Sequence, residues 1–408
     1  MFVGKGGVGK STLATATAVR AARSGMRVLI VSTDQAHSTG DVLGMGIAPT
    51  GRREPTRVSA DLETVDAGGG SLDALALDTL ALLADRWRHS AALLAERFPE
   101  SDIGDIAPEE LSALPGVQEV LGLHEVGELA DSGQWDLVVV DCASTADAMR
   151  MLTLPATFAL YLERAWPRHR RLSGAEDARS AALIGLLERV GAGTDQLSTM
   201  LTDGSRVTAH VVMTAERVVA AEAVRTLGSL ALMGVRVSEL IVNQLLVEDD
   251  SFEYSRLPQH PAFDWYAERI SEQRAVLVDL NRVVGDVQLV MVPHLAGEPI
   301  GAKALGELID RARRRDGAPP AGPLRPIVDR ESGSGLDAVY RLRLELPQVD
   351  STALALGRVD DDLIIGVGGM RRRVRLASVL RRCIVIDAGL RGSELTVRFR
   401  PNPEVWPA

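Results

Sequence analysis

The amino-acid sequence predicts an α/β protein, in which a doubly wound parallel sheet with an inserted helical subdomain is followed by a small antiparallel β-sandwich domain. Three observations support this prediction. A glycine-rich loop opens the chain directly before a helix, and short apolar runs then alternate with helical stretches. Beyond residue 335 the apolar period changes to two, which is typical of half-buried strands.

Apolar runs of strand length are typical of a buried parallel sheet. Five such runs lie between helical stretches, at residues 27–32, 135–141, 209–214, 240–243 and 287–292. Ligands of such sheets bind at the carboxyl ends of the strands. Four polar residues are expected at those ends: Ser11, Asp34, Asp141 and Asn243.

Two segments predicted to be helical stand apart from this alternation. Residues 71–100 and 175–200 carry apolar side chains at helical spacing, so we expect a helical subdomain at about residues 70–130 and 155–205. Leu75, Leu77 and Leu82 fall off the main stripe and widen the apolar surface. Two interpretations stay open: the stripes pack on the core, or they contact an apolar client polypeptide.

The C-terminal quarter of the chain has a different composition. Residues 313–335 are rich in Arg, Pro, Gly and Ser, and they predict a linker after a first domain of residues 1–312. Strict alternation at residues 340–347 and 395–399 then predicts an antiparallel β domain of residues 336–408.

Composition excludes several classes of protein. The 408-residue chain is 46% hydrophobic and 25% charged, and its net charge of −10 argues against nucleic-acid binding. No apolar run reaches the roughly 18 residues of a membrane span, so we expect no stable membrane insertion. No secretory signal precedes the loop, and we expect a cytoplasmic protein. Because only three residues precede Gly4, either the first strand is unusually short or the given start lies downstream of the true one.

The glycine-rich loop at residues 4–11 is a P-loop motif. Its backbone N–H groups surround phosphates, Lys10 reaches the β- and γ-phosphates, and the Ser11 hydroxyl coordinates Mg²⁺. The sequence therefore predicts an ATPase with ATP and Mg²⁺ as cofactors. The predicted nucleotide contacts in this stretch are Gly4, Lys5, Gly6, Gly7, Val8, Gly9, Lys10, Ser11 and Thr12.

Lysine is rare in this chain. Only Lys5, Lys10 and Lys303 occur among 45 basic residues, and a compact ammonium suits a site among phosphates better than a guanidinium does. Lys5 is either a solvated surface residue or a catalytic cation that reaches the nucleotide of a partner subunit. The second interpretation predicts a homodimer with nucleotide between its subunits.

Two carboxylates follow predicted strands. Asp34 is predicted to orient the attacking water or to hold the Mg²⁺ shell through water, with a helix N-cap as the structural alternative. Asp141 ends a run of four apolar residues, where a buried charge has little use without a metal. We therefore predict Ser11 and Asp141 as the metal ligands.

Further motifs occur in a fixed order: residues 32–38 (Ser-Thr-Asp-Gln-Ala-His-Ser), 115–119 (Pro-Gly-Val-Gln-Glu), 214–216 (Thr-Ala-Glu) with Glu222 and Arg225, and 242–245 (Val-Asn-Gln-Leu). Over about residues 1–310 they resemble the ATPase family that joins the arsenite-pump ATPase subunit to the tail-anchored-protein targeting factor. That resemblance implies that Asp34 positions the hydrolytic water, and that Lys5 acts in trans. It also implies that Glu216 contacts the nucleotide across the dimer and Asn243 contacts the adenine.

The chain departs from that family in three places. Gln35 stands where the first switch has proline. Residues 141–155 keep the frame of the second switch, but other residues occupy the positions of its proline, glycine and histidine. Cys142 and Cys383 are the only cysteines. They form neither the Cys-x-x-Cys zinc site between subunits nor a three-thiolate arsenite site, so metalloid binding is not expected.

The end of the chain resembles another family. Residues 344–347, 362–372 and 392–399 resemble strands of the small heat-shock (α-crystallin-like) β-sandwich. Two roles for this domain stay open: a cap that stabilises the dimer, or a holder of apolar client segments.

The leading hypothesis is a homodimeric ATPase that couples ATP binding and hydrolysis to opening and closing of a surface for apolar protein segments. One alternative is the catalytic subunit of an arsenite-type anion pump. It predicts stimulation by arsenite or antimonite, which the cysteine count disfavours, and we do not expect a membrane channel partner. The other is a positioning or scaffold ATPase with little hydrolysis. The altered second switch favours slow hydrolysis, whereas the missing terminal amphipathic helix argues against positioning on a membrane.

Overall fold

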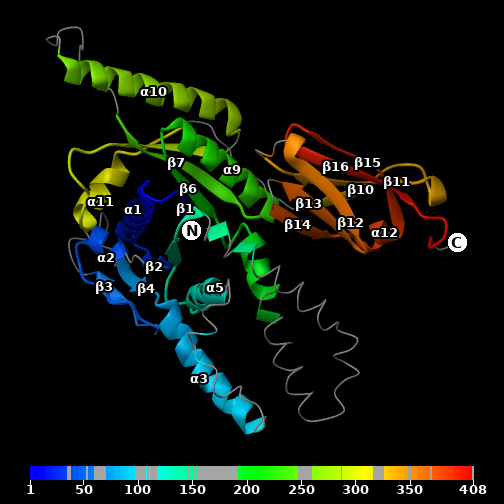
Figure 1. The fold of residues 1–408 in the computed structure, drawn as a ribbon, viewed down its shortest axis with the longest axis horizontal. Coiled ribbons are helices and arrows are strands. Elements are labelled where there is room, and N and C mark those ends of the chain that lie inside the picture. Colours follow the sequence, from blue (N-terminus) through cyan, green and yellow to red (C-terminus); the bar gives the residue numbers. More distant parts are fainter. Residues whose placement is uncertain are drawn as a thin grey trace. The chain divides into compact units, whose positions relative to one another are not determined.

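The computed structural model divides the chain into two compact units, each described by itself (Figure 1). The first contains Met1–Leu201, Ile241–Val247 and Val290–Arg314, and the second contains Thr202–Leu240, Glu248–Leu289 and Arg315–Ala408. The structure describes every residue except 35–37, 52–53, 59–69, 98–106, 108–109, 111–116, 146–147, 150–151, 154–191, 194, 247–259, 286, 316–325, 348, 350, 368–369 and 407–408.

The described strands between residues 2 and 314 belong to a mostly parallel sheet, whose order within the first unit includes β3-β4-β2-β5-β1. In the first unit, β2 pairs in parallel with both β4 and β5, so Ser32 lies beside Ala76 on one side and Asp141 on the other. β1 pairs in parallel with β5, while β3 and β9 are antiparallel to their neighbours. The strands are β1 (Phe2–Gly4), β2 (Arg27–Ser32), β3 (Thr56–Val58), β4 (Ser71–Ala76), β5 (Leu137–Asp141), β6 (Ala209–Thr214), β7 (Val237–Leu245), β8 (Gln288–Pro293) and β9 (Arg313–Arg314).

Helices connect these strands. In the first unit α1 begins at the P-loop, buries an alanine-rich face that includes Leu13, and ends before Gly25, whose φ of 94° suits glycine. Arg23 of α1 forms an ion pair with Asp310 of α11 at 3.0 Å. The helices of the sheet region are α1 (Lys10–Arg23), α2 (Ser38–Leu43), α3 (Thr79–Arg97), α5 (Val117–Asp131), α9 (Arg217–Met233), α10 (Pro261–Val283) and α11 (Ala302–Asp310).

The predicted fold class is confirmed. Two predicted strands, 27–32 and 209–214, have the predicted bounds, and the other three shift by a few residues. The predicted helix at residues 175–200 lies largely outside the described residues, although its end, 195–200, is helical. Within the described part of the chain, no helix is both long and apolar enough to cross a membrane.

The prediction of helix from residue 71 is wrong. Residues 71–76 form β4, and α3 begins only at Thr79. An apolar run is ambiguous between a buried strand and a helix, and pairing with β2 decides the outcome here. Leu75, Leu77 and Leu82 are at most 5% exposed, so they belong to the core and offer no surface to a client.

The C-terminal β domain, within the second unit, has two antiparallel sheets, shown in orange and red in Figure 1. Their facing side chains include Leu342, Val397 and Phe399, and Leu232 of α9 joins the same buried cluster. One sheet contains β10 (Ile327–Ser332), β11 (Val339–Glu345), β16 (Glu394–Pro401) and β15 (Cys383–Arg391), and the other contains β12 (Leu354–Val359), β13 (Asp362–Val367) and β14 (Met370–Arg375), with short helices at Gly335–Asp337, Ser351–Ala353 and α12 (Ser378–Arg381).

The segment predicted as a linker contains a strand. β10 lies within residues 313–335 and pairs with β11, although its side chains are mostly exposed. Backbone hydrogen bonds hold this edge strand, so its polar composition does not reveal it. Residues 316–325 lie outside the described part of the chain, and the domain boundaries stay a prediction.

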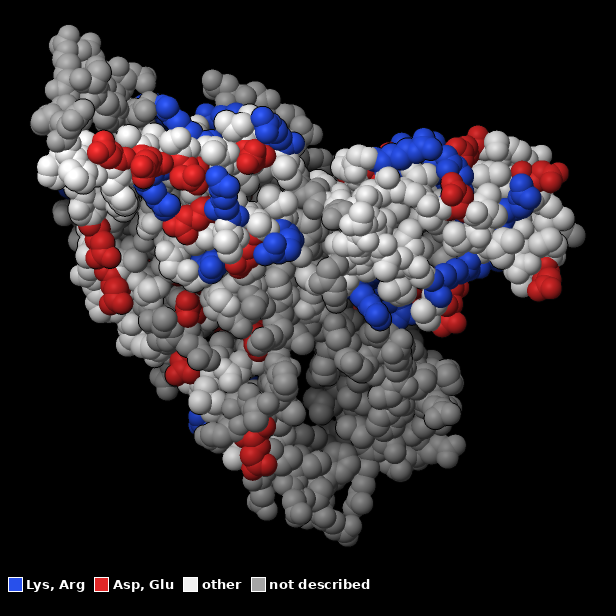
Figure 2. All heavy atoms as spheres, turned by 45° about the horizontal axis from the view of Figure 1, so that its top comes forward, with Lys and Arg blue, Asp and Glu red and all other residues white. Residues whose placement is uncertain are grey.

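The surface of the C-terminal β domain pairs its arginines with acids. Arg398 contacts Glu331 and Asp387 at 2.7 Å each, and Arg341 contacts Asp329 at 2.7 Å. Figure 2 accordingly shows basic and acidic side chains next to one another on the visible face of this domain. Mixed charge of this kind is typical of a solvated surface.

Candidate nucleotide site

The P-loop connects β1 to α1 and depends on glycine. Gly7 and Gly9 have φ angles of 81° and 90°, in the left-handed region that favours glycine. A Cβ at Gly9 would collide with the side-chain amide of Asn243. Any larger residue at position 9 would therefore displace the loop or the strand beside it.

Lys10 turns back over the loop. Its ammonium donates to the backbone carbonyl of Lys5 at 3.3 Å, and the residue is only 8% exposed. A buried cation held by a backbone carbonyl is free to exchange that contact for phosphate oxygens. Lys5 itself is exposed, and no described residue is a partner of its side chain. Thr12 lies half-buried in the first turn of α1.

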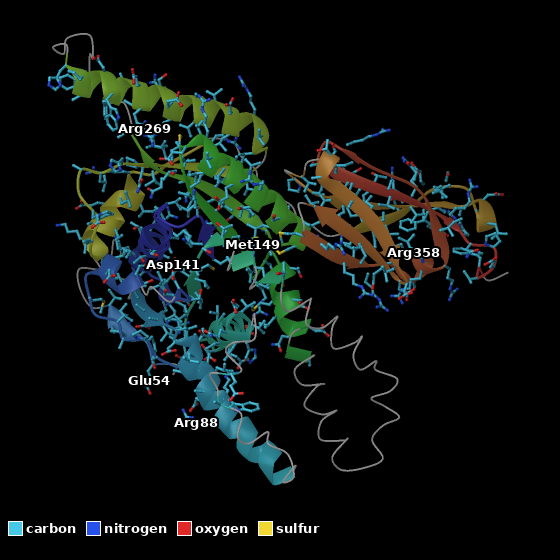
Figure 3. All side chains as sticks on the ribbon, in the orientation of Figure 1. Glu54, Arg88, Asp141, Met149, Arg269 and Arg358 are labelled. Atoms are coloured by element: carbon cyan, nitrogen blue, oxygen red, sulfur yellow. The ribbon has the colours of Figure 1, made fainter. Side chains whose placement is uncertain are left out.

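Asp141 ends β5 and is completely buried (Figure 3). Its Oδ2 accepts a hydrogen bond from the Thr39 hydroxyl at 3.3 Å, whereas its Oδ1 has no hydrogen-bond partner among the described residues. Burial raises the pKa of Asp141 to about 6. The Ser11 hydroxyl and the Lys10 ammonium oppose that shift, and the charge of Asp34 adds to it. A buried carboxyl oxygen without a hydrogen-bond donor is unusual, and a bound ligand would explain it.

Mg²⁺ fits this donor set. Asp141 supplies a buried oxygen to which no described residue donates, and Ser11 supplies a hydroxyl that lies 2.7 Å from the Ser38 hydroxyl. Mg²⁺ takes one or two protein oxygens together with phosphate and water oxygens. The described residues include no cluster of three or more His, Cys, Asp or Glu side chains that could hold a metal ion.

Asp34 is held near the same edge of the sheet. The N–H of Thr33 donates to the backbone carbonyl of Asp141 at 3.0 Å, and the N–H of Asp34 donates to the Ser32 hydroxyl at 3.3 Å. Asp34 is half-buried. Gln35 and the two residues after it lie outside the described part of the chain, so the catalytic role of Asp34 stays a prediction.

Asn243 supports the loop. It is 6% exposed on β7, and its side-chain N–H donates to the backbone carbonyl of Val8 at 2.9 Å. This contact explains why position 9 has no room for a side chain. The predicted contact with adenine stays a prediction, and one amide hydrogen of Asn243 is already used inside the protein.

Glu216 lies in the second unit. It precedes α9 as its N-cap residue, and its carboxylate accepts a hydrogen bond from Arg269 of α10 at 2.8 Å. The side chain is 49% exposed. Its predicted role across a dimer stays a prediction.

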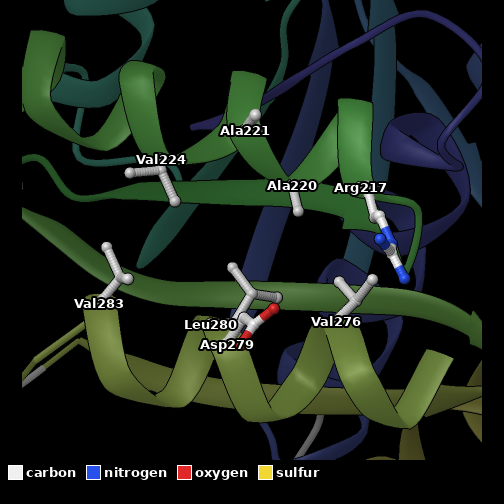
Figure 4. Close-up of a pocket in the computed structure, with 8 residues that line it drawn as sticks. All are labelled: Arg217, Ala220, Ala221, Val224, Val276, Asp279, Leu280 and Val283. Carbon is white, nitrogen blue, oxygen red and sulfur yellow. The ribbon is translucent and has the colours of Figure 1, made fainter. Parts of the chain in front are cut away.

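The second unit also contains a small apolar pocket between α9 and α10 (Figure 4). Ala220 and Val224 line one side and Val276 and Leu280 the other, with Arg217 at one end. Its lining includes none of the predicted site residues and few polar groups, so it is not a candidate for phosphate binding.

Sequence reasoning missed the part played by α2. Ser38 and Thr39 place their hydroxyls against Ser11 and Asp141, although only Ser38 belonged to a recognised motif. A hydroxyl pair shortly after Asp34 was the available signal. Cys142 is buried and its pKa is raised to about 12 by that burial, so its thiol stays protonated at neutral pH. Much of the second switch, residues 146–147, 150–151 and 154–155, lies outside the described residues.

The fold and the site define a P-loop nucleotide-binding protein, because a glycine-dependent loop, a buried lysine and a buried aspartate meet where α1 begins. Residues 1–312 match the family model described as anion-transporting ATPase, and residues 337–399 match the HSP20-like domain found in the same family. The chain therefore belongs to the anion-transporting ATPase family, as the sequence motifs predicted. The members of this family are ATPases that use ATP, typically with Mg²⁺.

Several curated proteins are similar to this chain over much of its length. Protein Rv2184c of Mycobacterium tuberculosis (strain ATCC 25618 / H37Rv) is 72% identical over 408 residues, which cover all of this chain and 97% of that protein. A putative arsenical pump-driving ATPase of Prosthecochloris vibrioformis is 28% identical over 268 residues, 62% of each chain. ATPase GET3 of Kluyveromyces lactis is 26% identical over 349 residues, which cover 81% of this chain and 91% of that protein.

Proposed function

We propose that this protein is a homodimeric ATPase that couples Mg²⁺-dependent ATP binding and hydrolysis to opening and closing of a surface for apolar protein segments. The observation that carries the ATPase part is the contact of Lys10 with the P-loop backbone, next to a buried Asp141 whose Oδ1 has no hydrogen-bond partner in the described part of the chain. These groups suit a phosphate chain and its metal, and a purely structural role leaves the carboxylate oxygen unexplained.

The residues of the proposed nucleotide site have different roles. The loop N–H groups and Lys10 bind the phosphates, Ser11 and Asp141 hold Mg²⁺, and Asp34 orients the attacking water. When bound, Mg²⁺ neutralises charge that develops on the phosphate oxygens. The reaction then depends on placement of these groups, since phosphoryl transfer needs little covalent chemistry from the protein.

The dimer is part of the same proposal. Lys5 is exposed at the loop and contacts no acceptor among the described residues, which suits a cation that acts on the nucleotide of a partner subunit. The resemblance of the sequence motifs to the ATPase family supports this arrangement.

The client surface has no assigned residues. Leu75, Leu77 and Leu82 are core residues, so making them polar would unfold the protein instead of testing capture of a client. Most of the second predicted helical segment, 154–191, lies outside the described residues. The pump alternative is disfavoured, because both cysteines are buried and Cys142 is a protonated thiol at neutral pH.

Two lysine variants test the proposal. We expect Lys10→Ala to weaken ATP binding by roughly 100-fold or more, because it removes a charge-assisted contact to phosphate. Lys5→Ala is expected to bind ATP normally and to hydrolyse it at least about 10-fold more slowly, since a trans cation acts on the transition state. Lys303→Ala is the matched control, because Lys303 lies on α11 and is not part of the P-loop motif.

Binding is measured with a fluorescent ATP analogue, hydrolysis by phosphate release, and assembly by light scattering with and without nucleotide. Undiminished turnover of Lys5→Ala contradicts the trans mechanism. Normal ATP binding by Lys10→Ala contradicts the assignment of the nucleotide site itself.

A further inference from the structure

We propose that Ser38 and Thr39, the first two residues of α2, are positioning residues for the Mg²⁺ site, each acting on one metal ligand. This inference rests on the proposed nucleotide function. Thr39 donates to Asp141 Oδ2 at 3.3 Å, and the Ser38 hydroxyl lies 2.7 Å from the Ser11 hydroxyl. Two adjacent residues thus contact both candidate ligands.

Thr39 orients Asp141 without neutralising it. Thr39 is 1% exposed, and its hydroxyl holds one carboxylate oxygen while the other is left without a described partner. An arginine or lysine in the same place would pair with the carboxylate and compete with a metal ion. A hydroxyl instead fixes the plane of the carboxylate and leaves its charge available, as groups that orient metal ligands commonly do.

Ser38 provides a place for the proton of Ser11. A serine hydroxyl has one proton and two lone pairs, so Ser11 either donates to Ser38 or accepts from it while no metal is bound. If Ser11 held Mg²⁺ through a lone pair, its proton would need an acceptor. Ser38 Oγ, at 2.7 Å, is such an acceptor beside the Asp141 carboxylate. A metal on Ser11 would therefore favour donation from Ser11 to Ser38 and link α2 to the loop.

Threonine-to-valine substitution separates positioning from packing. Thr39→Val keeps the shape of this buried side chain and removes its hydroxyl, and Thr39→Ser restores the hydroxyl. Thr226→Val is the matched control, because Thr226 is also buried in a helix and its hydroxyl donates to the carbonyl of Glu222 in α9. Ser38→Ala is a second variant that removes a half-buried hydroxyl with little loss of packing.

The experiment uses the full-length protein with ADP bound, and it measures Mn²⁺ affinity by electron paramagnetic resonance in place of Mg²⁺. We expect Thr39→Val to raise the Kd for Mn²⁺ about 10-fold or more, and Ser38→Ala to raise it several-fold. Thr39→Ser should lie within about threefold of wild type, and metal-free ADP binding should be the same in all variants. Thr226→Val should keep the wild-type Mn²⁺ affinity and lose only thermal stability.

Each contrary result has a defined meaning. Wild-type Mn²⁺ affinity in both Thr39→Val and Ser38→Ala overturns the positioning role and leaves the proposed function intact. An equal loss in Thr226→Val shows that general destabilisation is the cause, and it overturns the inference as well. A wild-type protein that holds no Mn²⁺ beside ADP contradicts the proposed function and this inference with it.

Discussion

Two buried aspartates of the first unit have opposite surroundings. Asp73 on β4 is 7% exposed, and both of its oxygens have donors: Trp135 Nε1 at 2.9 Å and Arg57 Nε at 2.7 Å. Asp141 on β5 is fully buried, receives one hydroxyl at Oδ2, and has no described partner at Oδ1. Hydrophobic burial alone does not distinguish the two residues.

The difference lies in the accounting of hydrogen bonds. A buried carboxylate whose oxygens are all paired contributes to structure, as Asp73 does between β3, β4 and Trp135. A buried carboxylate with an unpaired oxygen and a raised pKa is a candidate for ligand binding. Glu125 belongs with Asp73, because it is 2% exposed and is paired with Arg86 of α3.

The strongest test of this comparison is Asp141→Asn. We expect it to weaken Mn²⁺ binding beside ADP by at least about 100-fold, because loss of a metal ligand costs more than loss of a residue that orients one. Electron paramagnetic resonance titration measures this affinity, with Asp73→Ala as the paired control. Equal Mn²⁺ affinities in Asp141→Asn and wild type would remove Asp141 from the metal site.

Stability of the metal-free protein should depend on pH through Asp141. Burial raises its pKa from 3.8 to about 6, so the folded state holds this proton more tightly than the unfolded state. The unfavourable contribution is absent below pH 3.8, grows as the pH rises towards 6, and is complete above it. It amounts to about 3 kcal/mol at neutral pH.

Asp141→Asn removes this cost. Relative to wild type, the metal-free variant should therefore gain free energy of unfolding between pH 5 and pH 8, as measured by urea denaturation. Parallel stability curves for the two proteins across this range would show that the environment of Asp141 is not as apolar as its burial indicates.

Asp73→Ala should lower the free energy of unfolding, and this loss should be smaller than the gain in Asp141→Asn. Its removal leaves the Trp135 N–H buried without an acceptor, which costs about 2 kcal/mol of unfolding free energy. Arg57 is 61% exposed and returns to water at little cost. Urea denaturation measures the loss of unfolding free energy. The refolded Asp73→Ala variant should bind Mn²⁺ with wild-type affinity, unlike Asp141→Asn. An unchanged stability would mean that the pairs around Asp73 contribute nothing net.

Much of the fold follows from local patterns. Runs such as 27–32 and 209–214 are apolar on both faces and bounded by turns, so their strands could be predicted to the residue. Residues 71–76 could not, because Leu72 and Ala76 continue the helical stripe of the residues that follow, and only pairing with β2 decides for a strand. β10 was not predicted because its exposed side chains form no apolar pattern. Backbone hydrogen bonds to β11 hold this edge strand.

The candidate site likewise has a part that local sequence predicts and a part that depends on contacts between distant residues. The P-loop was predictable because its function requires glycines and a lysine at fixed spacing in consecutive residues. The pairing of Thr39 with Asp141 joins residues 102 positions apart, and the support of Val8 by Asn243 joins residues 235 positions apart. No spacing rule connects such residues.

The sequence by itself determined the class of fold, the phosphate-binding loop, the family and the two candidate acids, because each depends on short-range pattern and backbone geometry. Only the tertiary structure decided that Leu75, Leu77 and Leu82 are core and that Asn243 supports the loop. It also decided that both oxygens of Asp73 have donors, whereas no described residue donates to Oδ1 of Asp141. The physical reason is that burial and hydrogen-bond pairing depend on which distant segments pack together, and several packings are compatible with one local pattern.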